Sequence, residues 1–100
     1  MNLQEIRAFI ALAEELHFTR AAERLEVSQP QFSHLIRRLE QRVEAPLVER
    51  TTRRVALTTA GRAVLPHARR ALQEMKLIQR SAHGMKGAIQ GTVRMGYAGA

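Results

Sequence analysis

The sequence predicts a mainly α-helical fold in which three short helices are followed by a two-stranded hairpin and one long helix. Apolar residues recur at helical spacing in four separate stretches, and capping residues precede these stretches. Between the third and fourth stretches, a short segment alternates apolar and polar residues, as a hairpin does. The chain has 100 residues, of which 45% are hydrophobic, and this suffices for one small domain with a modest core.

The first two helices are short and are separated by only a few residues. The first is expected over residues 3–16, where Asn2 and Glu5 have the spacing of an N-cap and its reciprocal partner. The second is expected over residues 20–25, with Thr19 as its cap.

The third helix, expected over residues 29–44, contains a proline near its start. Ser28 is a favourable N-cap, and Gln31 has the capping-box spacing three residues later. Pro30 then falls in the first turn, where its missing N–H would have had no partner within the helix. The proline therefore marks the beginning of the helix and makes its front rigid.

One side of this third helix is apolar and the opposite side is polar, which leaves the polar side available to a partner. The residues on the polar side are Pro30, Ser33, His34, Arg37 and Gln41, with Arg38 beside them. Short side chains at the front of this side would let the backbone come close to that partner.

A small hairpin is expected after the third helix, because residues 47–50 and 55–57 alternate apolar and polar positions. The residues between them, 51–54, lack Gly and Asn, which predicts a looser tip than a tight primed turn. Three basic residues lie on or beside this tip: Arg50, Arg53 and Arg54.

A long last helix is expected from its cap, Thr58, to about residues 81–85, with a bend at Pro66. Apolar side chains recur along it at alternating spacings of four and three, as in a heptad seam. This seam consists of Val64, Ala68, Ala71, Met75, Ile78 and Ala82, followed by Met85. A helix of this length extends beyond the body formed by residues 1–58, which favours a second chain, rather than the domain's own helices, as the partner of the seam.

The charge of the chain is unevenly distributed. The net charge is +7, but residues 1–49 hold six Arg against eight Glu, whereas residues 50–100 hold eight Arg and two Lys against a single Glu. A basic half suggests a polyanionic partner, most often nucleic acid. The alternative is a solvated surface that only keeps the protein soluble.

The second and third helices, joined by residues 26–28, have the order and length of a helix-turn-helix, and the hairpin that follows has the place of a wing. The second helix of such a pair fits the major groove of duplex DNA, with its N-terminal residues at the base edges. Arg37 is placed to reach guanine or a phosphate. The three arginines of the wing are placed to hold the backbone or to enter the minor groove.

Residues 18–61 contain the elements "AAERL", "VSQP", "IRRLE" and "LTTAG", in this order and spacing. Through these elements the segment resembles the DNA-binding domain of LysR-type transcriptional regulators. The resemblance implies a winged helix-turn-helix over residues 1–58, a linker helix for dimerisation over residues 59–89, and the start of an effector domain over residues 90–100. It further implies tetramers of the intact protein, an interrupted dyad operator in double-stranded DNA, and a pocket for a small-molecule inducer in the absent effector domain.

The resemblance also implies which residues meet DNA. On the third helix, the residues that face the groove are Gln29, Pro30, Gln31, Ser33, His34 and Arg37. At the start of the second helix, Thr19 and Arg20 touch phosphates.

Four positions depart from the usual pattern of that family. His34 stands where members often carry Arg, so direct base reading there competes with a solvated surface histidine. Phe32 and Val48 replace residues that are commonly a smaller aliphatic residue and a Phe, which predicts a repacked core. Glu26 occupies the turn where Gly, Asn or His is commoner, which predicts some strain there.

The sequence has no pattern typical of an enzyme, since no acid–base pair, nucleophile triad or phosphate loop is recognisable. His17, His67 and His83 are too scattered to suggest a metal site, the chain has no cysteine, and no cofactor is expected in it. No apolar run is long enough to span a membrane, and the start lacks the basic residues of a signal peptide, so a cytoplasmic location is expected. The main alternative to DNA binding is a helical oligomerisation module.

Overall fold

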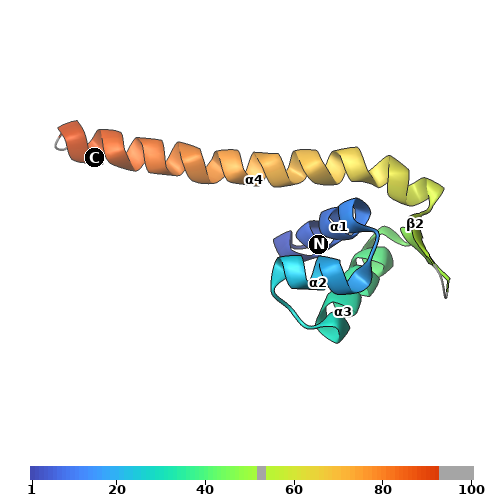
Figure 1. The fold of residues 1–100 in the computed structure, drawn as a ribbon. Coiled ribbons are helices and arrows are strands. Elements are labelled where there is room, and N and C mark those ends of the chain that lie inside the picture. The colour runs from blue at the N-terminus through green and yellow to red at the C-terminus, as the bar shows by residue number, and fades with distance from the viewer. Residues whose placement is uncertain (52–53, 93–100) are drawn as a thin grey trace.

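Three helices form a body, a two-stranded wing projects from it, and a long helix passes over it and extends well beyond (Figure 1). In this computed structural model the chain is described over residues 1–51 and 54–92, and over residues 85–92 only its helical backbone is described. The elements are α1 (Leu3–Glu15), α2 (Phe18–Leu25), α3 (Gln29–Val43), β1 (Val48–Arg50), β2 (Val55–Leu57) and α4 (Thr59–Thr92). The order of the elements confirms the predicted fold class.

Helix α1 begins with the predicted capping box. The Asn2 side chain accepts a hydrogen bond from the backbone N–H of Glu5 at 2.9 Å, and the Glu5 carboxylate accepts one from the backbone N–H of Asn2 at 3.4 Å. The helix ends at Glu15, one residue earlier than expected, because Leu16 adopts the left-handed conformation with φ 51°.

The predicted cap of α2 was wrong. His17 is the N-cap, and its Nδ1 accepts a hydrogen bond from the backbone N–H of Arg20 at 3.1 Å, while Thr19 lies within the first helical turn. The left-handed Leu16 reverses the chain and leaves His17 extended, so α2 begins two residues before the expected start. The backbone turn at Leu16 therefore outweighed the usual preference for a hydroxyl side chain at the N-cap.

Helix α3 begins as predicted, with the Ser28 side chain accepting a hydrogen bond from the backbone N–H of Gln31 at 3.2 Å and Pro30 in the first turn. The turn that precedes α3 contains Glu26 in the left-handed conformation with φ 60°, and Glu44 ends α3 in the same way with φ 57°. A non-glycine residue in this conformation costs about 1–2 kcal/mol, which agrees with the strain predicted at Glu26.

The core lies where α1 meets the other three helices. The largest fully buried apolar side chains are Phe9, Leu12, Phe32, Ile36, Leu39 and Leu47. Phe18 packs edge to face on Phe32, with ring centroids 6.0 Å apart and an interplanar angle of 87°. The predicted apolar stripe of α3 is thus directed into the core, and Phe32, one of the atypical residues, lies at its centre.

The wing is an antiparallel pair in which Val48 lies opposite Leu57, Glu49 opposite Ala56 and Arg50 opposite Val55. This confirms the predicted hairpin. The expected loose tip, however, includes residues 52 and 53, which lie outside the described residues.

Helix α4 begins as predicted but continues further. Thr58 caps it by accepting a hydrogen bond from the backbone N–H of Gly61 at 3.0 Å. The helix passes through Pro66 and runs to Thr92, past its expected end at residues 81–85. A glycine inside a helix costs about 1 kcal/mol relative to alanine, and this cost does not end α4. Figure 1 shows the first turns of α4 at an angle to its remaining length, as the prediction of a bend at Pro66 requires.

The start of the effector domain, expected over residues 90–100, falls mostly on residues 93–100, which lie outside the described residues, and residues 90–92 belong to α4. Among the described residues, no helix is both long and apolar enough to cross a membrane.

Candidate nucleic-acid interface

The predicted polar face of α3 is a continuous outer surface of the body. The side chains of Gln29, Pro30, Gln31, His34 and Arg37 are exposed, and Ser33 is half-buried among them. A shallow hollow on this surface is lined by Gln29, Pro30, Ser33 and Arg37. All six residues implied to face a DNA groove are thus at least partly exposed, because the apolar side of α3 is held in the core.

The start of α2 lies beside the front of α3. The Thr19 hydroxyl donates a hydrogen bond to the side-chain oxygen of Gln29 at 3.3 Å, which leaves the amide nitrogen of Gln29 for another partner. Arg20 is exposed, and its guanidinium lies 3.6 Å from the Glu15 carboxylate. The structure thus brings Thr19 next to the α3 face, whereas it ties Arg20 to the end of α1.

The capping box predicted for α3 is only half formed. Ser28 accepts from the backbone of Gln31, but in the described part of the chain the Gln31 side chain makes no return bond to Ser28. The exposed amide of Gln31 is therefore not occupied by helix capping.

The arginines of α3 differ in what they contact. Arg42 lies 3.1 Å and Arg38 3.5 Å from the carboxylate of Glu5, which is fully buried on α1. Arg37 has no ion-pair partner within residues 1–51 and 54–84. A buried carboxylate needs a compensating charge, so Glu5 holds two of the three arginines on the α1 side and leaves Arg37 on the polar face.

The arginines of the wing differ in the same way. Arg53 lies outside the described residues. Arg54 is exposed at the tip, where its backbone N–H and carbonyl bond to Thr51. Arg50 is the last residue of β1, beside the tip, but its guanidinium lies 3.6 Å from the Glu40 carboxylate and its guanidinium carbon is 5.2 Å from the centroid of the Phe18 ring.

A separate ion-pair network joins α1, α2 and α4. Glu14 receives hydrogen bonds from Arg24 at 2.6 Å and from Arg69 at 3.2 Å. The hydrogen bond from Arg24 holds the pKa of the Glu14 carboxyl below its ordinary value, and it raises the pKa of Arg24. Arg69 therefore links α4 to α1.

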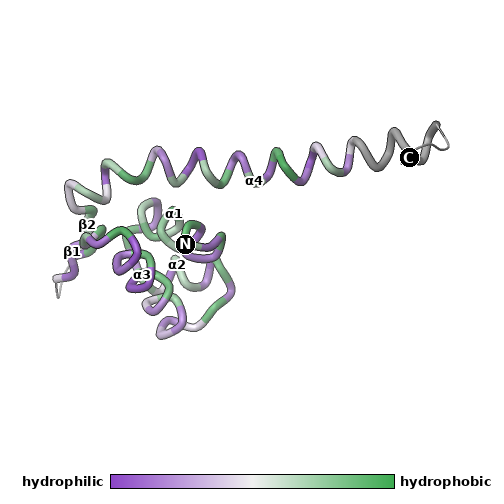
Figure 2. Tube along the Cα trace, turned by 180° about the vertical axis from the view of Figure 1, so that it is seen from behind, coloured by the Kyte–Doolittle hydropathy of each residue, from purple (hydrophilic) through white to green (hydrophobic). Residues whose placement is uncertain are grey.

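The predicted seam of α4 is divided between two environments. Val64, Ala68, Ala71 and Met75 pack on the body, whereas Ile78 lies beyond the body with 68% of its surface exposed. Ala82 is exposed as well. Figure 2 shows hydrophobic and hydrophilic residues still alternating along this outer part of α4. The first half of the seam thus has a partner in its own chain, and the second half has none among the described residues.

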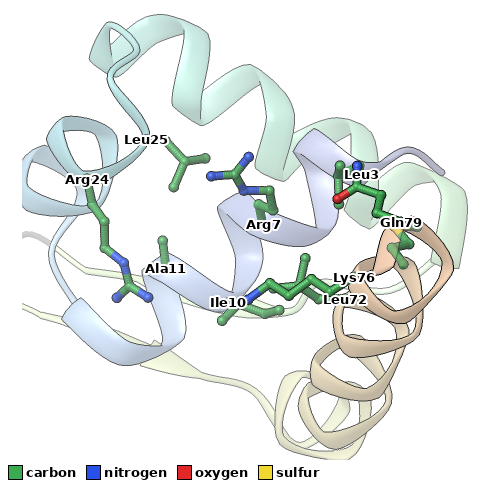
Figure 3. Close-up of a pocket in the computed structure, with 10 residues that line it drawn as sticks. Leu3, Arg7, Ile10, Ala11, Arg24, Leu25, Leu72, Lys76 and Gln79 are labelled. Carbon is green, nitrogen blue, oxygen red and sulfur yellow. The ribbon is translucent and has the colours of Figure 1, made fainter. Parts of the chain in front are cut away.

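Two hollows flank the contact between α1 and α4. One has a volume of about 540 Å³ and is lined mainly by apolar residues, among them Ile6, Leu39, Val43, Val64, Ala68 and Ala71. The other has a volume of about 420 Å³ and lies between α1, the end of α2 and α4, with Arg7, Arg24 and Lys76 around apolar side chains (Figure 3). Neither hollow contains a residue of the polar face of α3.

Sequence reasoning assigned no role to Glu40, although it lies within the motif "IRRLE". Its carboxylate accepts hydrogen bonds from the backbone N–H groups of Leu47 and Val48, at 2.8 Å and 3.3 Å. The role of Gly61 was missed as well. A Cβ atom at Gly61 would lie 2.1 Å from the Leu47 carbonyl oxygen. The one indication of these roles in the sequence was that Glu40 lies in the motif "IRRLE" and Gly61 in the motif "LTTAG".

Residues 3–62 match the protein family described as bacterial regulatory helix-turn-helix protein, lysR family. The chain is 46% identical to the HTH-type transcriptional regulator ShiR of Corynebacterium glutamicum, over 99% of this chain and 34% of that protein. It is 38% identical to the DNA-binding transcriptional dual regulator OxyR of Escherichia coli, over 96% of this chain and 32% of that protein. The chain therefore spans about a third of the length of these relatives.

Solved structures show the same likeness. A full-length OxyR variant from Pseudomonas aeruginosa superposes with a TM-score of 0.81 at 37% identity, covering 84% of this chain and 28% of that one. The DNA-binding domain of CbnR in its DNA complex gives a TM-score of 0.75 at 38% identity, covering 88% of this chain and 98% of that one. The DNA-binding domain of BenM in a DNA complex gives 0.81 at 31% identity, with 86% and 97% covered.

Proposed function

The chain belongs to the LysR family of bacterial helix-turn-helix regulators, and from this premise we propose that it binds an interrupted dyad in double-stranded DNA as a homodimer. The observation that carries the proposal is the polar face of α3, which leaves Arg37 exposed and unpaired within residues 1–51 and 54–84 while Arg38 and Arg42 are held by Glu5. An unpaired arginine on a helix of this kind suits guanine or phosphate. The relatives named above are regulators, which agrees with the expectation that this chain is not an enzyme.

In the proposed complex, α3 enters the major groove and the wing follows the adjacent backbone or minor groove. The side chains proposed for the groove are those of Gln29, Pro30, Gln31, Ser33, His34 and Arg37, with Thr19 and Arg20 at phosphates. Arg53 and Arg54 are the wing residues proposed for the backbone. The division proposed for the chain is a winged helix-turn-helix over residues 1–58, a linker helix over residues 59–89 and the start of an effector domain over residues 90–100, although α4 itself continues to Thr92.

We propose that the two copies pair through α4 in an antiparallel manner. The apolar hollow beside Val64 and Ala68 is uncovered, and Ile78 is an exposed apolar residue of the same helix. If two α4 helices cross near Leu72 in opposite directions, Ile78 of each copy reaches the hollow of the other. A parallel pair would place Ile78 against Ile78 and leave both hollows open to water, so the hydrophobic effect favours the antiparallel arrangement.

The remaining parts of the proposal concern the intact regulator. It would form tetramers, act in the cytoplasm where its operator lies, and take a small-molecule inducer in its effector domain. No cofactor is proposed for residues 1–100.

Selection of bound sequences from a random pool of duplex DNA tests the proposed function directly. The expected result is an interrupted dyad with two related half-sites. The alternative, a helical oligomerisation module, predicts no enriched sequence, and such a result would remove the proposal.

Affinity for the selected DNA is expected to fall steeply as salt is raised, because arginines that neutralise phosphates release condensed counterions. Arg54→Ala should weaken binding to all sequences about equally and lower the slope of log affinity against log salt by about one. The measurement is a titration by fluorescence anisotropy at several salt concentrations. Arg80→Ala, an exposed arginine on the outer part of α4, serves as the control and should leave the slope unchanged. An affinity that is flat between low and physiological salt would contradict the phosphate contacts.

Gln29→Ala is expected to relax the base preference at one position of each half-site. A bidentate contact between Gln and adenine is worth about 1–3 kcal/mol of discrimination. Repeating the selection with the variant measures this loss position by position. Gln73→Ala, on the exposed part of α4, should select the same sequence as the wild type. If Gln29→Ala also selects an unchanged sequence, Gln29 does not read a base.

A further inference from the structure

We infer that Glu40 is a positioning residue that holds the wing at the correct angle to α3, and that Arg50 is its counter-ion rather than a phosphate contact. The inference rests on the proposed function, because it concerns how two parts of the same DNA-binding surface are held together. It arises from the contacts of the root of the wing, residues 46–48, and of Arg50 at the other end of β1.

The carboxylate of Glu40 joins α3 directly to the first strand of the wing. One of its oxygens, Oε2, accepts hydrogen bonds from the backbone N–H of Leu47 at 2.8 Å and of Val48 at 3.3 Å. Only 17% of the Glu40 side chain is exposed, so these bonds are largely screened from water. Charge-assisted bonds to backbone donors are stronger than neutral ones, and here they fix where the wing leaves the body.

The other carboxylate oxygen of Glu40 faces Arg50. The Nη2 atom of Arg50 lies 3.6 Å from Oε1 of Glu40, and its guanidinium lies over the ring of Phe18 on α2. Phe18 in turn packs on Phe32 of α3. Arg50 therefore lies at a junction of α2, α3 and the wing, where its charge offsets that of Glu40 and its plane packs on an aromatic ring.

The opposite side of the wing root is held by Thr58, the residue between β2 and α4, and not by Glu40. The Leu47 carbonyl accepts a hydrogen bond from the backbone N–H of Thr58 at 3.1 Å, and the Thr58 hydroxyl donates to the Pro46 carbonyl at 2.7 Å. A change at Glu40 thus releases the wing from α3 only. The root of the wing stays attached to α4, and the core residues of the body keep their contacts.

The direction of the change in DNA affinity distinguishes a positioning role of Glu40 from simple electrostatic repulsion. A carboxylate close to a DNA-binding surface repels phosphates, so neutralising it should by itself strengthen binding. If Glu40 positions the wing, neutralising it should instead weaken binding to the selected site. The two explanations therefore predict opposite changes in affinity.

The test compares Glu40→Gln with a matched control, Glu49→Gln. Glu49 is an exposed acid on β1 that has no ion-pair partner within residues 1–51 and 54–84. Glu49→Gln should bind the selected DNA at least as tightly as the wild type, whereas Glu40→Gln should bind about tenfold more weakly, as expected from the loss of charge-assisted bonds. Hydroxyl-radical protection of the backbone beside the wing should be lost, while methylation protection of guanines under α3 should remain.

A second measurement needs no DNA and keeps the inference testable if the proposed function fails. In Glu40→Gln, amide hydrogen exchange should become faster at Leu47 and Val48 and stay unchanged at the buried residues of α1. Arg50→Gln keeps the hydrogen bonds between Glu40 and the backbone, and it should also weaken DNA binding. The variant that carries both substitutions should bind DNA no more weakly than the single variant with the lower affinity, because both changes act on the same contact. If Glu40→Gln does not fold, Arg50→Gln provides the same comparison.

Three results would overturn the inference. One is that Glu40→Gln binds the selected site as tightly as Glu49→Gln does. Another is unchanged exchange at Leu47 and Val48. The third is that Arg50→Gln lowers the salt slope by about one without loss of the wing footprint, because this is the behaviour of a phosphate contact. If the wild-type chain selects no sequence at all, the proposed function fails, and the exchange measurement alone decides the role of Glu40.

Discussion

Gly61→Ala is expected to destabilise the domain by about 1–3 kcal/mol, the usual cost of overpacking. A Cβ atom at this position would lie 2.1 Å from the Leu47 carbonyl oxygen and 3.1 Å from its carbonyl carbon. The Leu47 carbonyl is not free to move, because it accepts the hydrogen bond from Thr58 and its own side chain is fully buried. The first turn of α4 would have to separate from the wing root, and DNA binding should weaken with it.

The measurement is the free energy of unfolding in urea, compared with that of Gly84→Ala. Both glycines lie in α4, but a Cβ atom at Gly84 would meet nothing within 4 Å. Alanine favours a helix over glycine by about 1 kcal/mol, so Gly84→Ala should leave stability unchanged or raise it slightly. The same substitution in the same helix is therefore expected to have opposite effects. If Gly61→Ala is as stable as Gly84→Ala, α4 does not begin against the wing root.

Ile78→Asp is expected to give monomers and to lower affinity for the full dyad about a hundredfold or more, since avidity between two linked half-sites is worth a factor of about 10²–10⁴. Ile78 is 68% exposed in the single chain, so an aspartate there should not disturb the fold. In the proposed antiparallel pair, the same aspartate would be buried in an apolar hollow without a partner, and symmetry places this charge at two sites. Light scattering at tens of micromolar and titration of the full dyad measure the two effects.

Gln73→Asp is the matched control for Ile78→Asp. It adds the same charge to the same helix, at an exposed position on the side away from the seam. It should leave both the dimer and the affinity for the dyad nearly unchanged. A wild-type chain that is already monomeric at these concentrations, together with an Ile78→Asp variant that binds the dyad equally well, would refute pairing through α4.

Local spacing in the sequence was sufficient for most of the fold. The capping residues of α1, α3 and α4 lie three residues from the backbone groups they bind, so their roles follow from short-range geometry. The polar face of α3 follows equally from the helical repeat, because the apolar residues of that helix must enter the core. The sequence alone therefore determined where α1, α3 and α4 begin and which surface of α3 faces outward, but not where α2 begins.

Only the tertiary structure decided what each charged or small residue contacts. Arg37, Arg38 and Arg50 are the same type of residue, but Glu5 holds one, Glu40 holds another, and the third is unpaired within residues 1–51 and 54–84. These pairings join residues far apart along the chain, and composition or spacing carries no information about them. The same reason explains why Gly61 must lack a side chain, because the obstacle is the backbone of Leu47. It also explains why half of the seam of α4 packs on the body, because the partner of this half depends on where α1 lies.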